Sequence, residues 1–294
     1  MGRKGEGQGE ETTVDRRSVL RSMAVGSTAL SGTSSFMAGN LGELECLSAE
    51  SPPDSYPVVE KDEGLFGGGA GFVQHGTFPD SPGEVVIYIH GWLELFTGRG
   101  AGQGYTLETA LRQQAYDHPT ITFAYPSNNI NWWGVKGDAE DDGRAFASWV
   151  EDYRERYPDV TIRMVGHSLG ARTGLGCLDE LVVKNGNEPI ESFAMIGGAI
   201  PRSAVTTDGE FATAITNGAR RVDNFFSEGD AILDYIYQLG ELGTEAVGAY
   251  GAPSDATTPT NYADHDVSDD VNGHCVYYKP DQGCVGDIVD SFEE

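Results

Sequence analysis

The run Val160-Thr-Ile-Arg-Met-Val-Gly-His-Ser-Leu-Gly170 decides the fold of this chain. Its first half is rich in apolar residues, as in a buried strand, and Ser168 follows on a turn between Gly166 and Gly170. A turn of this kind holds the serine in a strained conformation, and the small residues on either side let strand and helix approach closely. The stretch therefore predicts a nucleophile elbow centred on Ser168.

The residues after the turn continue this pattern. Apolar side chains recur at the spacing of one helix face, at Ala171, Leu175, Leu178 and Val182. Leu169 is then at the helix N-terminus, and its backbone N–H is expected to point to where negative charge develops on an attacked carbonyl. The alternative interpretation is an ordinary turn whose serine caps the helix. The chain contains no second G-x-S-x-G.

Strand and helix patterns alternate on both sides of the elbow. Strands are predicted at 85–91, 120–125, 161–165, 192–197, 221–226 and 262–267. Helices are predicted at 106–116, 139–157, 210–217 and 231–242, in addition to the helix after Ser168. This order favours an α/β fold with one mostly parallel sheet flanked by helices. Ligands bind such sheets at the carboxyl ends of the strands.

A serine nucleophile needs a base and a third group that orients the base. Asp230 follows strand 221–226 within a short loop, which suits the third group, although an aspartate there is also a common helix N-cap. Asp223 is the alternative acid, but it lies inside the predicted strand.

His274 is the expected base, because it lies in a loop beyond the last predicted strand. His265 is inside that strand, so its side chain should point to a face of the sheet. His75 and His118 have no such placement, and they are interpreted as surface or core polar groups. His167 precedes the nucleophile, and its side chain should be aimed away from it.

The order of Ser168, Asp230 and His274 resembles that of the α/β-hydrolase family, over about residues 85–280. The motif Ile89-His90-Gly91-Trp92 after an early strand matches the same family. The resemblance implies a three-layer fold. The short connection 198–209 departs from the larger lipases and leaves room for little or no lid domain. The resemblance also implies that the backbone N–H groups of Leu169 and Trp92 form an oxyanion hole.

The leading hypothesis is an exported serine hydrolase that cleaves carboxylic esters, with lipids among its possible substrates, through an acyl-enzyme on Ser168. An amidase or peptidase of the same fold would use the same three residues. A non-catalytic binding protein of this fold is the alternative from another class, and it would lack a member of the triad, yet none is missing. No cofactor is implied.

Two loops bear on substrate access. The connection 198–209 is too short for a lid domain, and the glycine-rich loop 93–104 is interpreted either as a mobile flap or as a plain surface loop. Trp132 and Trp133 are expected either to line an acyl pocket or to pack under a helix.

Residues 1–49 resemble a twin-arginine signal peptide, since Arg16 and Arg17 precede an apolar stretch. A flexible basic tail is the alternative. Cleavage is expected near Ala49, followed by a linker at 50–64, the hydrolase domain at 65–294 and a secreted or extracytoplasmic location. A lipid anchor at Cys46 is disfavoured by the charged residue before it, and no later stretch is apolar enough to span a membrane.

The net charge of −27 argues against nucleic acid and anionic lipid as partners. Removal of residues 1–49 would leave 40 acidic and 14 basic residues, an excess that is typical of proteins from salt-loving organisms. The oligomeric state and the substrate are not determined by the sequence.

The remaining cysteines and carboxylates suggest one crosslink and no metal site. A disulfide between Cys275 and Cys284 is predicted, and Cys177 is expected to be a buried thiol. The acidic run 264–273 is not an EF-hand, because position six from Asp264 is an aspartate and position twelve is a cysteine. No histidine spacing suggests zinc.

Overall fold

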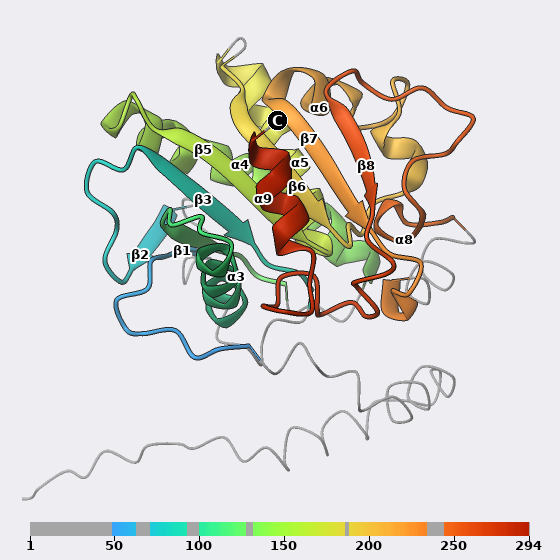
Figure 1. The fold of residues 1–294 in the computed structure, drawn as a ribbon. Helices are drawn as coiled ribbons and strands as arrows, with labels where there is room; N and C mark the ends of the chain where they lie inside the picture. Colours follow the sequence, from blue (N-terminus) through green and yellow to red (C-terminus); the bar gives the residue numbers. More distant parts are fainter. Residues whose placement is uncertain are drawn as a thin grey trace, which may run out of the picture. The chain divides into compact units, whose positions relative to one another are not determined.

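The computed structural model describes residues 49–62, 71–92, 100–127, 132–185, 188–233 and 244–293. It contains one eight-stranded sheet between two layers of helices (Figure 1). The predicted signal peptide lies outside the described residues, as does Cys46. Among the helices within these ranges, none is both apolar enough and long enough to cross a membrane.

The strands follow the order β2-β1-β4-β3-β5-β6-β7-β8 across the sheet. Their bounds are β1 Val58–Asp62, β2 Gly71–His75, β3 Glu84–Ile89, β4 Thr120–Ala124, β5 Thr161–His167, β6 Ile190–Ile196, β7 Ala219–Phe226 and β8 Tyr262–Asp266. The edge strand β2 is antiparallel to β1, and all the other neighbouring pairs are parallel. The mostly parallel sheet predicted from the sequence is confirmed.

The helices form the two outer layers. They are α3 Ala101–Gln113, α4 Trp132–Arg156, α5 Leu169–Asn185, α6 Ala212–Gly218, α8 Val247–Tyr250 and α9 Val285–Glu293, with a short 3-10 helix, η3, at Arg202–Val205. Figure 1 shows α3 and α9 in front of the sheet, and α4 and α5 behind it.

Alternate residues of β3 pack into the two layers, because successive side chains of a strand point to opposite faces. Val85, Ile87 and Ile89 belong to a core with residues of α4, α5 and α6. Val86 and Tyr88 belong to a second core with residues of α3 and α9. All five are fully buried, which explains why β3 has a continuous apolar pattern instead of an alternating one.

Several elements differ from the sequence prediction. Strand β1 lies inside the predicted linker 50–64, and it pairs in parallel with β4. The linker assignment is therefore wrong for 58–62, because Val58 and Val59 are buried against the sheet. Helix α9 was not predicted, although its apolar residues also recur at helical spacing.

The predicted flap 93–104 is partly helical, because α3 begins at Ala101. The glycines of this stretch allow the start of α3 to pack closely against β4 and His90. A Cβ on Gly104 would lie 2.0 Å from Thr122 Oγ1, and Gly100, the N-cap, has a φ of +76°. Residues 93–99 lie outside the described residues. The connection 197–211 contains only η3, so no lid domain is inserted there.

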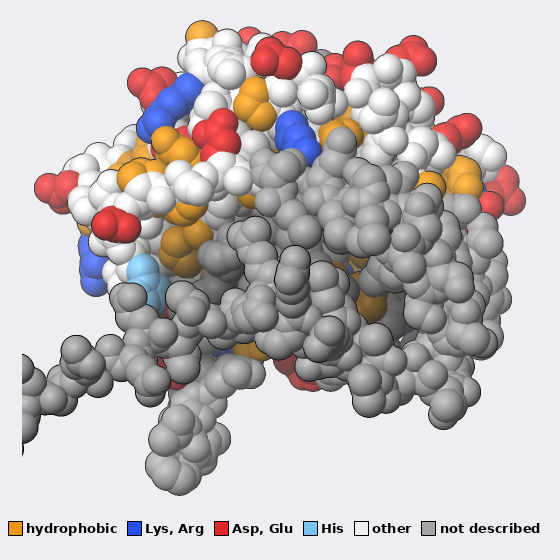
Figure 2. Space-filling view, turned by 90° about the horizontal axis from the view of Figure 1, so that it is seen from below, with side chains coloured by type: hydrophobic (Ala, Val, Ile, Leu, Met, Phe, Trp, Pro, Cys, Tyr) orange, Lys and Arg blue, Asp and Glu red, His pale blue; other side chains and the backbone are white. Residues whose placement is uncertain are grey.

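The surface is acidic, as the composition implies. On the coloured part of the face in Figure 2, carboxylates outnumber basic side chains. At molar salt the Debye length is about 3 Å, which screens repulsion between these charges. We therefore expect the protein to lose its fold or activity on dialysis into dilute buffer. Circular dichroism and activity that are unchanged at low salt would contradict this prediction.

Candidate active site

The nucleophile elbow forms as the sequence predicts. Ser168 stands between β5 and α5 with a φ of +55°, a strained value for a residue with a side chain. A Cβ on Gly166 would lie 2.7 Å from the carbonyl oxygen of Gly170, and a Cβ on Gly170 would lie 2.2 Å from that of Ile89. Both positions therefore need glycine for α5 to pack closely against β5 and β3.

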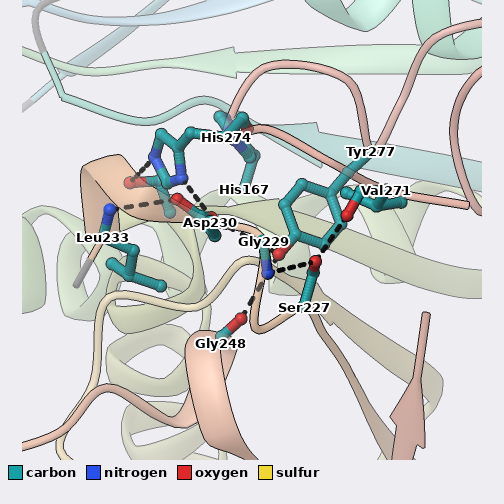
Figure 3. Close-up of polar contacts among 10 residues, drawn as sticks. His167, Ser227, Gly229, Asp230, Leu233, Gly248, Val271, His274 and Tyr277 are labelled. Carbon is teal, nitrogen blue, oxygen red and sulfur yellow. Dashed lines mark hydrogen bonds and ion pairs between the residues drawn. The ribbon is translucent and has the colours of Figure 1, made fainter. Parts of the chain in front are cut away.

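The structure brings together the serine, histidine and aspartate singled out in the sequence. The Oγ of Ser168 lies 2.8 Å from Nε2 of His274. Nδ1 of His274 lies 2.7 Å from Oδ2 of Asp230 (Figure 3). A carboxylate accepts hydrogen bonds, so Nδ1 carries the proton and Nε2 is left to accept the Ser168 hydroxyl proton. All three side chains are buried. This arrangement can activate a serine for nucleophilic attack.

Asp230 also caps the turn that follows it. Its Oδ1 accepts the backbone N–H of Leu233 at 3.0 Å, while Oδ2 faces His274. The two interpretations of Asp230 from the sequence are therefore compatible, because each uses a different carboxylate oxygen. The hydroxyl of Ser227 donates to the carbonyl of Val271 at 2.5 Å, which ties the aspartate loop to the histidine loop.

His167 contacts the backbone and the ring of His274. Its Nε2–H donates to the backbone carbonyl of His274 at 2.7 Å, and the two rings are 4.8 Å apart. Burial lowers the pKa of His167 well below its usual value, with the nearby His274 adding to this effect. A neutral His167 ring keeps this hydrogen bond and places no positive charge next to His274. The sequence predicted only that His167 points away from Ser168.

The predicted oxyanion loop follows β3. Gly91 lies against the nucleophile, since a Cβ on Gly91 would be 3.0 Å from Cβ of Ser168. Leu169 is the first residue of α5, so its N–H has no partner within the helix. These placements put the Gly91–Trp92 peptide beside the turn that carries Ser168 and Leu169.

His90 fixes the orientation of that peptide. Its Nδ1–H donates to the Gly91 carbonyl at 2.8 Å, and its Nε2 accepts the Tyr125 N–H at 3.2 Å. In a trans peptide the C=O and N–H bonds point in opposite directions. Because the Gly91 carbonyl is held toward the His90 ring, the N–H of Trp92 points away from this ring. The hydrogen bond that Nε2 accepts from Tyr125 requires a neutral imidazole, because both ring nitrogens of a protonated histidine are donors.

Acid should destabilise the protein through His90. Burial lowers the pKa of His90 from 6.5 to about 4, so the unfolded chain binds its proton first as the pH falls. The stabilising effect of neutral His90 is thus present above pH 6.5 and is lost between pH 6.5 and 4, amounting to about 3 kcal/mol. Urea unfolding at pH 7 and pH 4.5 should show a smaller loss for His90→Asn than for wild type. An equal loss in both proteins would contradict this prediction.

The alternative acid and histidine form a separate pair. Asp223 Oδ1 lies 2.7 Å from His265 Nε2, and Asp223 Oδ2 accepts Nε–H of Arg221 at 2.7 Å. The His265 ring stacks on Phe225 within the sheet, 4.7 Å between ring centroids. This pair lies on a face of the sheet, whereas Ser168 lies beyond the end of β5.

The sequence analysis also considered the acidic run 264–273, metal ligands and two tryptophans. Asp264 in the acidic run accepts hydrogen bonds from Asn224, Tyr262 and the backbone of Ala252. In the described part of the chain, no group of three or more histidines, cysteines or carboxylates is placed to hold a metal ion. The side chains of Trp132 and Trp133 lie outside the described residues.

The predicted bridge between Cys275 and Cys284 is wrong. The thiol of Cys284 is free and buried, and it lies 3.7 Å from the carbonyl of Tyr277. Burial within the core beneath α9 raises the pKa of this thiol. The N–H of Cys284 donates to the carbonyl of Tyr277 at 3.1 Å. Cys177 is a free, buried thiol, as predicted.

The topology and the elbow are those of the α/β-hydrolases. The chain belongs to the family described as "Protein of unknown function (DUF726)", whose model matches residues 105–287. This match includes the elbow and the loops of Asp230 and His274, whereas the oxyanion loop precedes it.

Comparison with curated proteins and solved structures gives distant similarities. A segment of 116 residues, 40% of this chain, is 30% identical to the "Uncharacterized membrane protein C6F6.13c" of Schizosaccharomyces pombe and spans 19% of that protein. The esterase of Pyrobaculum calidifontis is 14% identical, with a TM-score of 0.48 over 94% of this chain and 96% of its own. The phospholipase PlaB of Legionella pneumophila is 15% identical, with a TM-score of 0.39 over 62% of this chain and 50% of its own.

Proposed function

We propose that this protein is a serine hydrolase that cleaves carboxylic esters, lipid esters among them, through an acyl-enzyme on Ser168. One observation carries the proposal: the continuous hydrogen-bonded series from Ser168 through His274 to Asp230, at 2.8 and 2.7 Å. A serine at a strained elbow with a buried, oriented imidazole is the arrangement that nucleophilic catalysis requires.

In the proposed reaction, Nε2 of His274 takes the Ser168 proton while Oγ attacks the substrate carbonyl. The carboxylate of Asp230 stabilises the imidazolium that results. The backbone N–H groups of Leu169 and Trp92 bind the oxyanion, each contributing on the order of 3 kcal/mol. His274 then protonates the leaving alcohol. In the second half of the reaction His274 takes a proton from water as the water attacks the acyl-enzyme, and it returns this proton to Ser168.

Labelling by a fluorophosphonate probe tests the proposal. We expect labelling of the wild-type protein and none of Ser168→Ala. Absence of wild-type labelling would favour a non-catalytic protein, and labelling that survives the substitution would place the nucleophile elsewhere. A series of p-nitrophenyl esters of increasing acyl length, run beside matched anilides, separates an esterase from an amidase and defines the acyl preference.

We further propose that the protein is exported by the twin-arginine route, with Arg16 and Arg17 as the recognised pair. The support is the sequence pattern, because these residues lie outside the described part of the structure. Replacing both arginines by lysine should retain the protein in the cytoplasm of a native or related host. Equal export of both forms would contradict the proposal.

A further inference from the structure

Tyr277 is a buried residue that is not part of the triad but contacts Asp230. It lies three residues after His274, and its ring is fully buried. Its hydroxyl is 3.3 Å from Oδ2 of Asp230 and 3.3 Å from the carbonyl oxygen of Gly248 (Figure 3). One loop therefore supplies both the imidazole and a second donor to the same carboxylate oxygen.

The surroundings of the ring are shaped to allow this contact. Gly197, the residue that follows β6, has a φ of +54°. A Cβ there would lie 2.9 Å from Cε2 of Tyr277 and 3.2 Å from Oδ2 of Asp230. A side chain at this position would push the phenol ring and the carboxylate apart. The backbone of Tyr277 is also held, since its carbonyl accepts the N–H of Cys284 at 3.1 Å.

The hydroxyl has one proton for two acceptors. The Gly248 carbonyl already accepts the N–H of Ser227 at 3.1 Å, so it is satisfied without Tyr277. The Asp230 carboxylate is buried and charged, which makes it the stronger acceptor. Burial raises the pKa of Tyr277 well above its usual value, so the phenol keeps its proton. The hydrogen bond to Asp230 should therefore be the one that is formed.

We propose that Tyr277 is a positioning residue, which holds the Asp230 carboxylate in the plane of the His274 ring and withdraws negative charge from Oδ2. The inference rests on the proposed hydrolase function. Tyr277 touches no reacting atom, and it acts through Asp230. The charged or titratable groups around it are Asp230 on the β7 loop, His274 and Cys284 on its own segment, and His167 on β5, whose ring centroid is 6.4 Å from that of Tyr277.

The variant Tyr277→Phe isolates this role, because it removes one oxygen and keeps the ring. It leaves neither acceptor without a donor, since Oδ2 keeps His274 and the Gly248 carbonyl keeps Ser227. We expect kcat to fall about tenfold with KM unchanged, which is the effect of losing a hydrogen bond to a charged group. We also expect the acid limb of the kcat/KM profile to move to higher pH, because a more negative carboxylate favours the protonated imidazole.

Tyr153→Phe is the matched control. Tyr153 is also a buried tyrosine, but it lies on α4, where its ring stacks on Trp149 with 4.9 Å between centroids. Removing its hydroxyl should leave kcat and the pH profile unchanged. If thermal unfolding shows that Tyr277→Phe is destabilised, both variants are compared at a temperature where each is folded.

The outcomes separate this inference from the proposed function. If the wild type is active and Tyr277→Phe keeps both kcat and the acid limb, the positioning role is overturned and the hydrolase function stands. If the wild type reacts with neither probe nor ester, the hydrolase function fails. The positioning role then depends on NMR of His274, whose Nδ1–H resonance should shift in Tyr277→Phe and stay unchanged in Tyr153→Phe. An unshifted resonance in Tyr277→Phe overturns it.

Discussion

Replacing Ser168 by alanine is expected to lower kcat for ester hydrolysis by about a millionfold, the loss typical of removing the nucleophile from a serine triad. His274 and Asp230 then have no hydroxyl to activate, although substrate can still bind beside the N–H groups of Leu169 and Trp92. KM should change little, and a residual rate of roughly 10³–10⁴ over water should remain. Steady-state kinetics with the best ester of the p-nitrophenyl series measures both constants.

The control for this experiment is Ser148→Ala. The hydroxyl of Ser148 donates to the carbonyl of Ala145 within α4 at 2.7 Å, so its loss should affect neither kcat nor KM. The purity of the Ser168→Ala protein is checked by mass. If it keeps more than a few per cent of wild-type kcat, the assignment of the nucleophile is wrong.

Replacing Asp230 by asparagine should lower kcat by about 10⁴-fold. The carboxamide is close in size to the carboxylate, but it carries no charge and presents either its NH₂ group or its oxygen to Nδ1. His274 can then adopt the tautomer with the proton on Nε2, which cannot accept the Ser168 proton. The forming imidazolium also loses its counter-charge. Single-turnover kinetics should show that acylation is slowed.

The chain offers a close control in its second aspartate–histidine pair. Asp223 bonds His265 at 2.7 Å, the same separation as between Asp230 and His274. Asp223→Asn is expected to lower the free energy of unfolding, because Asp223 also pairs with Arg221, and to leave kcat unchanged. The assignment of the catalytic acid would be reversed if Asp223→Asn reduced kcat more than Asp230→Asn.

Local sequence patterns were sufficient to predict most of the strands of the sheet and the nucleophile elbow. The strands and helices between residues 84 and 226 appear where apolar periodicity predicts them, with ends that differ by a few residues in most cases. Helix α3 is an exception, since it begins at Ala101 inside a glycine-rich stretch that local propensity places in a loop. Close packing overrides propensity there, because the glycines bring the helix backbone against β4 and His90.

Contacts between distant segments could not be predicted in the same way. The bridge expected between Cys275 and Cys284 was inferred from location alone, and only the packing of α9 shows that Cys284 is buried in the core with a free thiol. The support that Tyr277 gives to Asp230 has no sequence signal either. A tyrosine three residues after a histidine is as compatible with core packing as with a hydrogen bond to a carboxylate.

The sequence by itself determined the α/β architecture, the strained serine turn and the order of the polar residues, because these depend on spacing over a few residues. It favoured Asp230 over Asp223 and His274 over the other histidines. Only the tertiary structure shows which of these side chains meet. Asp223 and His265 meet on a face of the sheet, whereas the loops after β7 and β8 bring Asp230 and His274 past the strand ends to Ser168. The physical reason is that hydrogen-bonding partners are selected by position in space, which the parallel register of β5, β6, β7 and β8 sets.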